Sequence, residues 1–156
     1  MKELFSFKEF IIDQYGCAMK IGTDSVLLGA WTSSSQNASA ILDIGAGTGL
    51  LALMMAQRSN AQTIDAIEPD EAAYEQCVEN FEASAWADRL FCYHADLEEF
   101  VEEFEEKYDL IICNPPFYTE DVSSGDVSRD KARQSRSMPF SMLLEGVSML
   151  LENNGM

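Results

Sequence analysis

The sequence has no run of about 18 consecutive apolar residues, so it predicts no transmembrane helix. Its first residues also lack the basic region and the long apolar core of a secretory signal. No C-x-x-C pair occurs, because the four cysteines stand far apart, at positions 17, 77, 92 and 113. This spacing is typical of reduced thiols, so we expect a cytoplasmic protein with no metal site and no membrane partner.

Positive charge is scarce. Only 10 lysines and arginines stand against 27 aspartates and glutamates, and the net charge is −17. Proteins that bind nucleic acids usually carry a basic patch, because neutralised phosphates release counterions. An acid-rich chain can still bind RNA if its few cations are clustered, so their distribution matters more than the sum. The length of 156 residues and the hydrophobic share of 47% fit one globular domain with a sizeable core.

Two catalytic signatures are also missing. His94 is the only histidine, and it has no Ser, Cys or Asp partner in a recognisable arrangement, so we interpret it as structural. The pattern G-x-x-x-x-G-K-[ST] does not occur, which excludes a P-loop for triphosphates.

The segment Ile41–Leu50 is a short apolar run that meets three glycines at alternate positions and continues into a helix former. This pattern predicts a strand, a tight loop and a helix. Gly45, Gly47 and Gly49 let the backbone turn sharply and approach a ligand where a Cβ atom would collide. The glycine spacing differs from the dinucleotide pattern G-x-G-x-x-G, and Asp43 just before the loop suits a ligand that bears an ammonium group. A tight turn that binds nothing is the alternative.

The pattern D-x-G-x-G-x-G in this segment resembles motif I of the Rossmann-like S-adenosylmethionine (SAM) methyltransferases. The rest of the chain agrees with an α/β fold of that kind, a mostly parallel sheet with flanking helices. We expect an N-terminal β-hairpin whose first strand lies in residues 4–12, where Phe5 and Phe7 alternate, whose turn is residues 13–16 and whose second strand is residues 17–21. Thr23 or Asp24 is the expected N-cap of the next helix. The remaining helices are expected at 50–59, 71–83, 97–106 and 140–151, and the strands at 41–44, 63–68, 90–94 and 108–113. The helix over 71–83 is expected to bury Ala73, Cys77, Val78 and Phe81.

Acidic residues follow two of the expected strands. Glu68 lies 19 residues after Gly49, at the end of the second strand of the sheet, where such folds hold a ribose diol. Asp96 follows the third strand in the same way. A solvated glutamate at a strand end is the alternative for Glu68. The helix over 97–106 carries six glutamates on its outer face, so much of the net charge lies on one solvated surface.

The strand over 108–113 ends in Asn114-Pro115-Pro116-Phe117. The two prolines fix the backbone there. The Asn114 side-chain oxygen and the Pro115 carbonyl can accept both N–H bonds of a planar amino group, and Phe117 can stack on a base taken out of its helix. We therefore interpret residues 114–117 as a catalytic motif that turns the nitrogen lone pair toward the methyl sulfonium of SAM, with orientation as the main source of rate.

The motif N-P-P-[FYW] resembles motif IV of methyltransferases that act on amino groups. Further segments are similar to the bacterial tRNA1(Val) adenine-N6 methyltransferases, namely residues 7–10, 19–31, 49–53, 56–58 and 128–133. The resemblance implies methylation of the N6 amino group of the adenine beside the anticodon of a tRNA. It also implies SAM binding by Asp43, Gly45, Gly47, Glu68 and Asp96, with Lys20, Thr23 and Asp24 in a family block near the cofactor.

Four of the ten basic residues lie within eight positions of one another: Arg129, Lys131, Arg133 and Arg136. Our hypothesis is that this cluster contacts tRNA phosphates beside the base pocket. The alternative is a solvated loop that pairs with the acidic surface.

The family continues into further strands beyond position 156, so we expect a single methyltransferase domain over 1–156 whose C-terminal strands are missing. Residues 1–39 would form the hairpin, the first helix and a linker, and residues 40–156 a truncated core. The strand over 108–113 would then lie near a sheet edge. Two alternatives to the tRNA activity stay open: a protein-glutamine N5 methyltransferase, which shares N-P-P-[FYW], and an inactive SAM-binding fragment.

Overall fold

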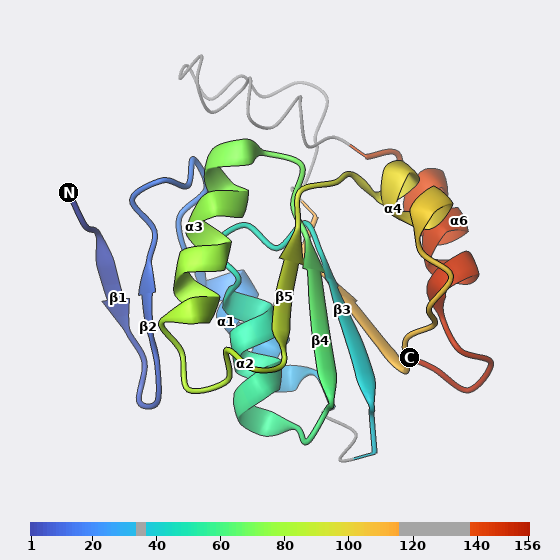
Figure 1. Ribbon diagram of the computed structural model, residues 1–156, viewed down its shortest axis with the longest axis horizontal. Coiled ribbons are helices and arrows are strands. Elements are labelled where there is room, and N and C mark those ends of the chain that lie inside the picture. The colour runs from blue at the N-terminus through green and yellow to red at the C-terminus, as the bar shows by residue number, and fades with distance from the viewer. Residues whose placement is uncertain (34–36, 116–137) are drawn as a thin grey trace.

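A four-stranded parallel sheet forms the centre of the protein (Figure 1). The computed structural model describes residues 1–33, 37–115 and 138–156. The strands are β3 (Ala40–Ile44), β4 (Thr63–Ile67), β5 (Leu90–Tyr93) and β6 (Leu110–Cys113), in the order β5-β4-β3-β6. The chain steps outward from β3 to β5 and then returns to place β6 on the other side of β3. The point between β3 and β6 is therefore the switch point at which open α/β sheets bind ligands.

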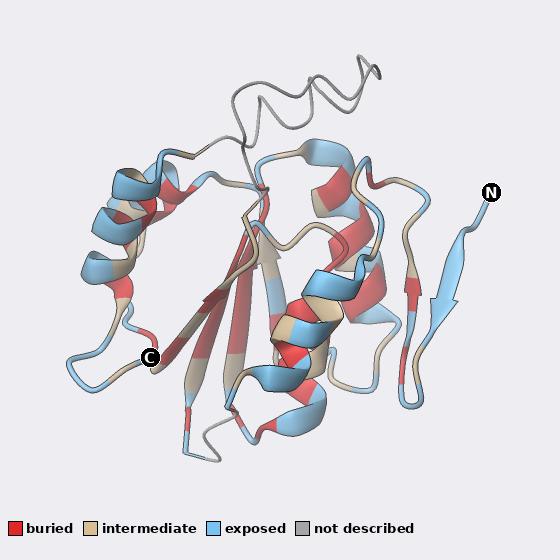
Figure 2. Cartoon of the chain, turned by 180° about the vertical axis from the view of Figure 1, so that it is seen from behind, coloured by how far each residue is buried: buried red, intermediate tan, exposed pale blue. Residues whose placement is uncertain are grey.

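Helices cover both faces of the sheet. α2 (Leu50–Arg58) and α3 (Glu71–Glu82) pack on one face, and α1 (Thr23–Trp31) packs on α2. α4 (Leu97–Glu103) and α6 (Phe140–Leu150) pack together on the opposite face. The buried side chains follow the alternation of the strands, so that Ile41 belongs to one hydrophobic cluster and Leu42 to the other. The buried strands between two helical layers are visible in Figure 2. The predicted Rossmann-like architecture is confirmed.

The hairpin exists, but its predicted turn is wrong. β1 (Leu4–Ser6) pairs with β2 (Ile11–Asp13) in antiparallel register, and residues 7–10 form the turn. The Phe7 amide donates to the Phe10 carbonyl at 2.9 Å, and the two rings stack with centroids 4.6 Å apart. Phe10 is buried, with its ring edge-on to Trp86. The aromatic residues that we assigned to a strand therefore fold the turn against the core, and residues 17–21 form no strand.

Three further details of the helices differ from expectation. The N-cap of α1 is Gly22, without a side-chain cap bond, so Thr23 and Asp24 lie inside the first turn. α4 ends at Glu103, because the chain turns extended at Phe104 and stacks that ring on Phe100 at 4.2 Å. On α3 the buried face includes the polar side chains Gln76 and Asn80, whereas Val78 is only half-buried.

β6 lies at an edge of the described sheet, as expected. The outer backbone of residues 108–111 nevertheless has partners in the last residues of the chain. The Tyr108 amide donates to the Leu150 carbonyl at 2.8 Å, and the Ile111 amide donates to the Met156 carbonyl at 2.8 Å. Tyr108 itself lies outside the strand and is buried, and its hydroxyl donates to Asp65 Oδ2 at 2.6 Å.

Candidate active site

A cavity of about 410 Å³ opens at the carboxyl ends of β3, β4 and β6. Because this position is the switch point of the sheet, loops from distant parts of the sequence converge on it. The described residues of its wall come from the segment before and within α1, the glycine loop, the ends of β4, β5 and β6, and the start of α6.

The glycine loop after β3 is built from three residues with positive φ: Gly45 at 71°, Gly47 at 56° and Gly49 at 82°. Gly45 and Gly47 line the cavity, and a Cβ atom on either would meet no other atom within 4 Å. At Gly49 a Cβ atom would lie 2.6 Å from Phe81 Cε1 and 2.9 Å from Cys77 Sγ. The first two glycines therefore leave space for a ligand, whereas Gly49 lets the N-terminus of α2 pack on α3.

Glu68 lies at the end of β4 and lines the cavity although its solvent exposure is 0%. Its Oε2 atom accepts a hydrogen bond from the Gly47 amide at 2.7 Å, and its Oε1 atom accepts one from the Asp70 amide at 3.0 Å. The carboxylate is thereby fixed in orientation beside the glycine loop, where it can accept hydrogen bonds from a ligand hydroxyl.

Asp43 lies behind the glycine loop, and the cavity wall does not include it. It is fully buried, and its Oδ2 atom accepts a hydrogen bond from the Ala52 amide in α2 at 3.1 Å. Its Oδ1 atom has no hydrogen-bond partner among the described residues. The pKa of Asp43 is raised to about 7: burial is the main cause, the Ala52 hydrogen bond opposes the rise, and the charge of Glu68 adds to it. The observed contact of Asp43 is therefore with α2, which its hydrogen bond to Ala52 anchors. Direct contact of Asp43 with SAM stays a prediction.

Asp96 lines the cavity and is the N-cap of α4. Its Oδ1 atom accepts a hydrogen bond from the Glu99 amide at 2.9 Å, and Glu99 Oε2 accepts one from the Asp96 amide at 3.1 Å. This capping box holds the Asp96 side chain at the rim of the cavity.

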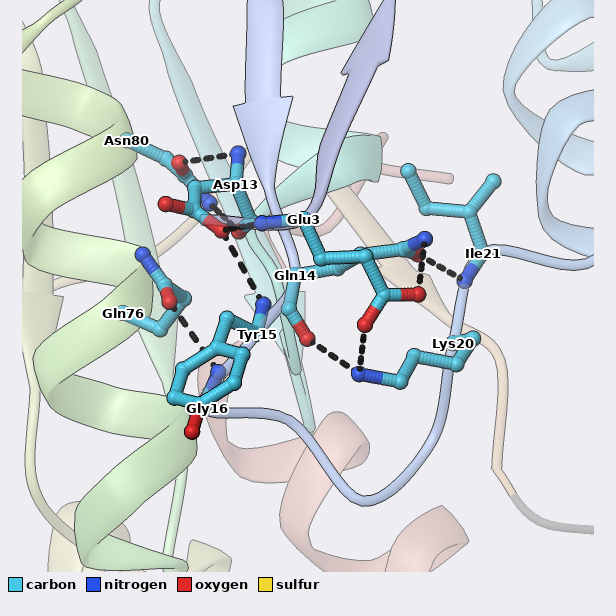
Figure 3. A network of polar contacts seen from close by, with 9 residues as sticks. All are labelled: Glu3, Asp13, Gln14, Tyr15, Gly16, Lys20, Ile21, Gln76 and Asn80. Atoms are coloured by element: carbon cyan, nitrogen blue, oxygen red, sulfur yellow. Dashed lines mark hydrogen bonds and ion pairs between the residues drawn. The ribbon is translucent and has the colours of Figure 1, made fainter. Parts of the chain in front are cut away.

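The segment before α1 forms a further part of the wall, to which Lys20 and Asp24 contribute. Thr23 is exposed and is not part of this wall. The Lys20 Nζ atom donates to Glu3 Oε2 at 2.8 Å and to the Gln14 carbonyl at 2.7 Å (Figure 3). The Lys20 ammonium is thus tied to the hairpin.

α3 holds the same segment from the other side. Asn80 Oδ1 accepts from the Asp13 amide at 2.8 Å, and Asn80 Nδ2 donates to the carbonyls of Asp13 and Thr48 at 2.9 Å each. Gln76 Oε1 accepts from the Gly16 amide at 3.2 Å, as Figure 3 shows. Asn80 therefore joins the hairpin to the glycine loop. Sequence reasoning missed both residues, because each partner lies 32 to 67 positions away.

Asn114 and Pro115 line the cavity directly after β6. The Asn114 Nδ2 atom donates to the Ser25 hydroxyl at 2.8 Å. Ser25 belongs to the wall, as do Met138, Pro139 and Met142, and sequence analysis singled out none of them. The predicted site residues Pro116, Phe117, Arg129, Lys131, Arg133 and Arg136 lie outside the described residues.

His94 lies outside the cavity wall, with Nε2 3.1 Å from the Pro69 carbonyl and its ring stacked on Tyr74. Across residues 1–33, 37–115 and 138–156, no cluster of three or more His, Cys, Asp or Glu side chains has the arrangement of a metal site. In the same part of the chain, no helix is both long and apolar enough to cross a membrane.

Known proteins share both the sequence and the fold. Proteins named tRNA1(Val) (adenine(37)-N6)-methyltransferase from Flavobacterium psychrophilum, Christiangramia forsetii and Shewanella sediminis are 60%, 63% and 46% identical over 97% of this chain. The resemblance predicted from the sequence is therefore confirmed. The chain spans 65%, 64% and 63% of the lengths of these three relatives.

Two solved structures illustrate the likeness in fold. A SAM-dependent methyltransferase from Agrobacterium tumefaciens has a TM-score of 0.69 at 12% identity, over 99% of this chain and 50% of that one. A SAM-dependent methyltransferase from Thiobacillus denitrificans, solved with S-adenosyl-L-homocysteine, has a TM-score of 0.59 at 18% identity, over 86% of this chain and 46% of that one.

The model of one protein family, described as the methyltransferase small domain, matches residues 18–138. The match extends from the segment before α1 to the wall of the cavity at Met138, and it includes the glycine loop and Asn114. The chain belongs to the methyltransferase small domain family.

Proposed function

We propose that the protein transfers a methyl group from SAM to the N6 amino group of the adenine next to the anticodon of a tRNA, valine tRNA by resemblance. The observation that carries this proposal is that the glycine loop, Glu68 and Asn114 lie on one cavity. A methyl donor and an amino group must meet at reacting distance, so their binding residues must share one site.

The cofactor part of the cavity suits SAM. Gly45 and Gly47 leave open space beside the loop, and the fixed Glu68 carboxylate can accept from the two ribose hydroxyls. The wall also carries Asp24, Asp96 and Glu98, while the single ammonium among its described residues, that of Lys20, is paired with Glu3. An acid-rich wall favours a ligand that carries a positive charge, as the SAM sulfonium does.

The amino group is proposed to bind at Asn114 and Pro115. Because Asn114 Nδ2 donates to Ser25, its Oδ1 atom is left to accept one amino N–H bond, and the Pro115 carbonyl can accept the other. Pro116 and Phe117 complete the proposed motif, with Phe117 as a stacking surface for the base. No strong base is needed, because the nitrogen attacks the methyl group before it loses a proton.

The basic cluster is proposed as the contact to tRNA phosphates. Four of the six cations outside the cluster are engaged within the fold. Lys20 binds Glu3, Arg58 donates to the Gly29 carbonyl, and Lys107 donates to the Met149 carbonyl. Arg89 donates to the carbonyls of residues 56, 59 and 61. Positive charge for RNA must therefore come mainly from the cluster, which the sequence places 12 positions after Phe117.

The names of the relatives support the same substrate, since three proteins at 46–63% identity are named for adenine-N6 methylation of tRNA1(Val). A tRNA substrate also fits the expected cytoplasmic location.

The test is an incubation of the protein with methyl-labelled SAM and unmodified valine tRNA, followed by digestion of the RNA and identification of the labelled nucleoside. We expect N6-methyladenosine. A matched reaction with Asn114→Ala should lose the product but keep S-adenosylhomocysteine binding in calorimetry.

Label that enters a glutamine of an added release factor, and not the tRNA, would favour the N5-glutamine alternative. Absence of S-adenosylhomocysteine binding would favour the inactive fragment.

A further inference from the structure

The Ser25 hydroxyl lies 2.8 Å from Asn114 Nδ2, although 89 positions separate the two residues in the chain. We propose that Ser25 is a positioning residue that sets the orientation of the Asn114 amide for the reaction. This inference rests on the proposed function and assigns a role to a side chain that the amino-group chemistry does not itself require.

The geometry explains why the orientation matters. A side-chain amide has a donor end and an acceptor end, and only the acceptor end can receive the N–H bond of a target amino group. With Nδ2 bonded to Ser25, Oδ1 is presented as the acceptor. A rotated amide would face the amino group with its own N–H bonds, and two donors do not bind each other.

Ser25 can restrain Asn114 because its own helix is held in place. On the side toward α2, Gly29 is buried so closely that a Cβ atom would lie 2.5 Å from Met54 Sδ. The Arg58 guanidinium, at the end of α2, donates to the Gly29 carbonyl. α1 is therefore fixed on α2, which itself begins at the glycine loop. The bond between Ser25 and Asn114 thus ties the amide to the element that forms the cofactor loop.

If the bond between Ser25 and Asn114 were purely structural, its loss would lower the stability of the fold. A positioning role predicts otherwise. Both side chains are only half-buried at the cavity, so water can replace a lost partner and the fold should tolerate the change. The effect of losing the hydroxyl should then fall on the reaction step and not on folding or cofactor binding.

The experiment compares Ser25→Ala, Ser25→Thr and the wild type in methyl transfer to valine tRNA. We expect Ser25→Ala to lower kcat about tenfold, which is about 1.4 kcal/mol of barrier. The KM for SAM and the Kd for S-adenosylhomocysteine should stay within about twofold, and Ser25→Thr should restore most of the rate because it keeps the hydroxyl. Ser148→Ala is the matched control, since Ser148 is exposed and its hydroxyl donates to the Glu145 carbonyl within α6.

A second readout does not depend on activity. In protein with ¹⁵N-labelled asparagine, the side-chain amide protons of Asn114, assigned with Asn114→Asp, should exchange with water about tenfold faster in Ser25→Ala. Unchanged exchange, or an unchanged kcat, would overturn the positioning role. If the wild type transfers no methyl group to tRNA, the proposed function fails, and the exchange rates alone then decide whether Ser25 orients the amide.

Discussion

The Oε2 atom of Glu68 lies 2.7 Å from the Gly47 amide, so the carboxylate at the end of β4 holds the loop at the end of β3. The same carboxylate accepts from the Asp70 amide through its other oxygen. One buried side chain therefore joins two strand ends of the sheet and lines the cavity between them. A substitution at Glu68 should therefore affect both the geometry of the glycine loop and the proposed binding of the ribose.

Replacement of Glu68 with Gln should weaken cofactor binding. The amide keeps one acceptor oxygen but lacks the charge that strengthens the hydrogen bonds from Gly47 and from a ribose hydroxyl. We expect a loss of about tenfold or more in affinity for S-adenosylhomocysteine, measured by calorimetry. Glu71→Gln, three positions later in the exposed first turn of α3, is the control and should bind normally. Equal affinity of Glu68→Gln and the control would exclude the ribose role.

Alanine at two positions of the glycine loop should have opposite consequences. Gly47→Ala adds a methyl group where the cavity is open, so its stability cost should be limited to the about 1–2 kcal/mol of a left-handed residue, while it should also reduce S-adenosylhomocysteine affinity. Gly49→Ala adds a methyl group that collides with Phe81 and Cys77, so it should cost about 3 kcal/mol or more of unfolding free energy. Urea denaturation and calorimetry on both variants measure the two effects. The same pattern of losses in both variants would contradict the division of roles.

Asn80→Ala should loosen the contact between the hairpin and α3. The substitution removes three hydrogen bonds and leaves backbone groups of Asp13 and Thr48 without their partner. We expect a loss of about 2–4 kcal/mol in unfolding free energy and faster amide exchange across residues 11–16. Gln76→Ala, which removes the single bond to the Gly16 amide, is the matched control and should cost less. If the amides of residues 11–16 stay protected from exchange in Asn80→Ala, the hairpin is held by other contacts.

The central sheet was predictable because its signals are local. Short, mostly apolar runs, each bounded by glycine, proline or polar residues, identified β3 to β6 within two residues of their bounds. The carboxyl ends of parallel strands share one edge, so the positions of Gly45, Glu68, Asp96 and Asn114 on one cavity followed from the strands alone.

The missed features depend on contacts distant in sequence. Phe5 and Phe7 alternate like strand residues, but Phe7 lies in the turn, where its ring stacks on Phe10 and Phe10 packs on Trp86, far along the chain. Asn80 is a polar residue on a helix that looks solvated, yet its partners are in the hairpin and the glycine loop. Ser25 has no local feature that marks it, because its partner is 89 positions away. Asp43 precedes the loop as predicted, but its depth below the loop is a property of the folded sheet.

The basic cluster should determine the salt dependence of tRNA binding. Arg133→Ala together with Arg136→Ala removes two cations, so the slope of log affinity against log salt should fall by about 1.4 to 1.8. Filter binding between low and physiological salt measures the slope. Lys2→Ala with Lys8→Ala, which removes the same charge from the region of the hairpin, is the comparison. An unchanged slope in the arginine pair, or an equal fall in the lysine pair, would move the phosphate contacts away from the cluster.

Asp43 should make the stability of the protein fall as the pH rises from about 4 to about 7. Its pKa is about 7 in the folded protein and 3.8 when unperturbed, so between these values the folded state holds a proton that the unfolded state has lost. Unfolding therefore becomes easier with rising pH, by at most about 4 kcal/mol, and the effect levels off above pH 7. Buried Asp65, whose pKa burial also raises, contributes with the same sign.

Asp43→Asn cannot ionise, and its side-chain oxygen can still accept from the Ala52 amide. Urea denaturation of both proteins between pH 5 and 8, above the isoelectric point of about 4.1, should show a flatter dependence for the variant. Asp65→Asn, studied in the same way, measures the contribution of Asp65 to the pH dependence of stability. A slope that Asp43→Asn leaves unchanged would mean that Asp43 is already ionised in the folded protein at pH 5, with its charge stabilised beneath the loop.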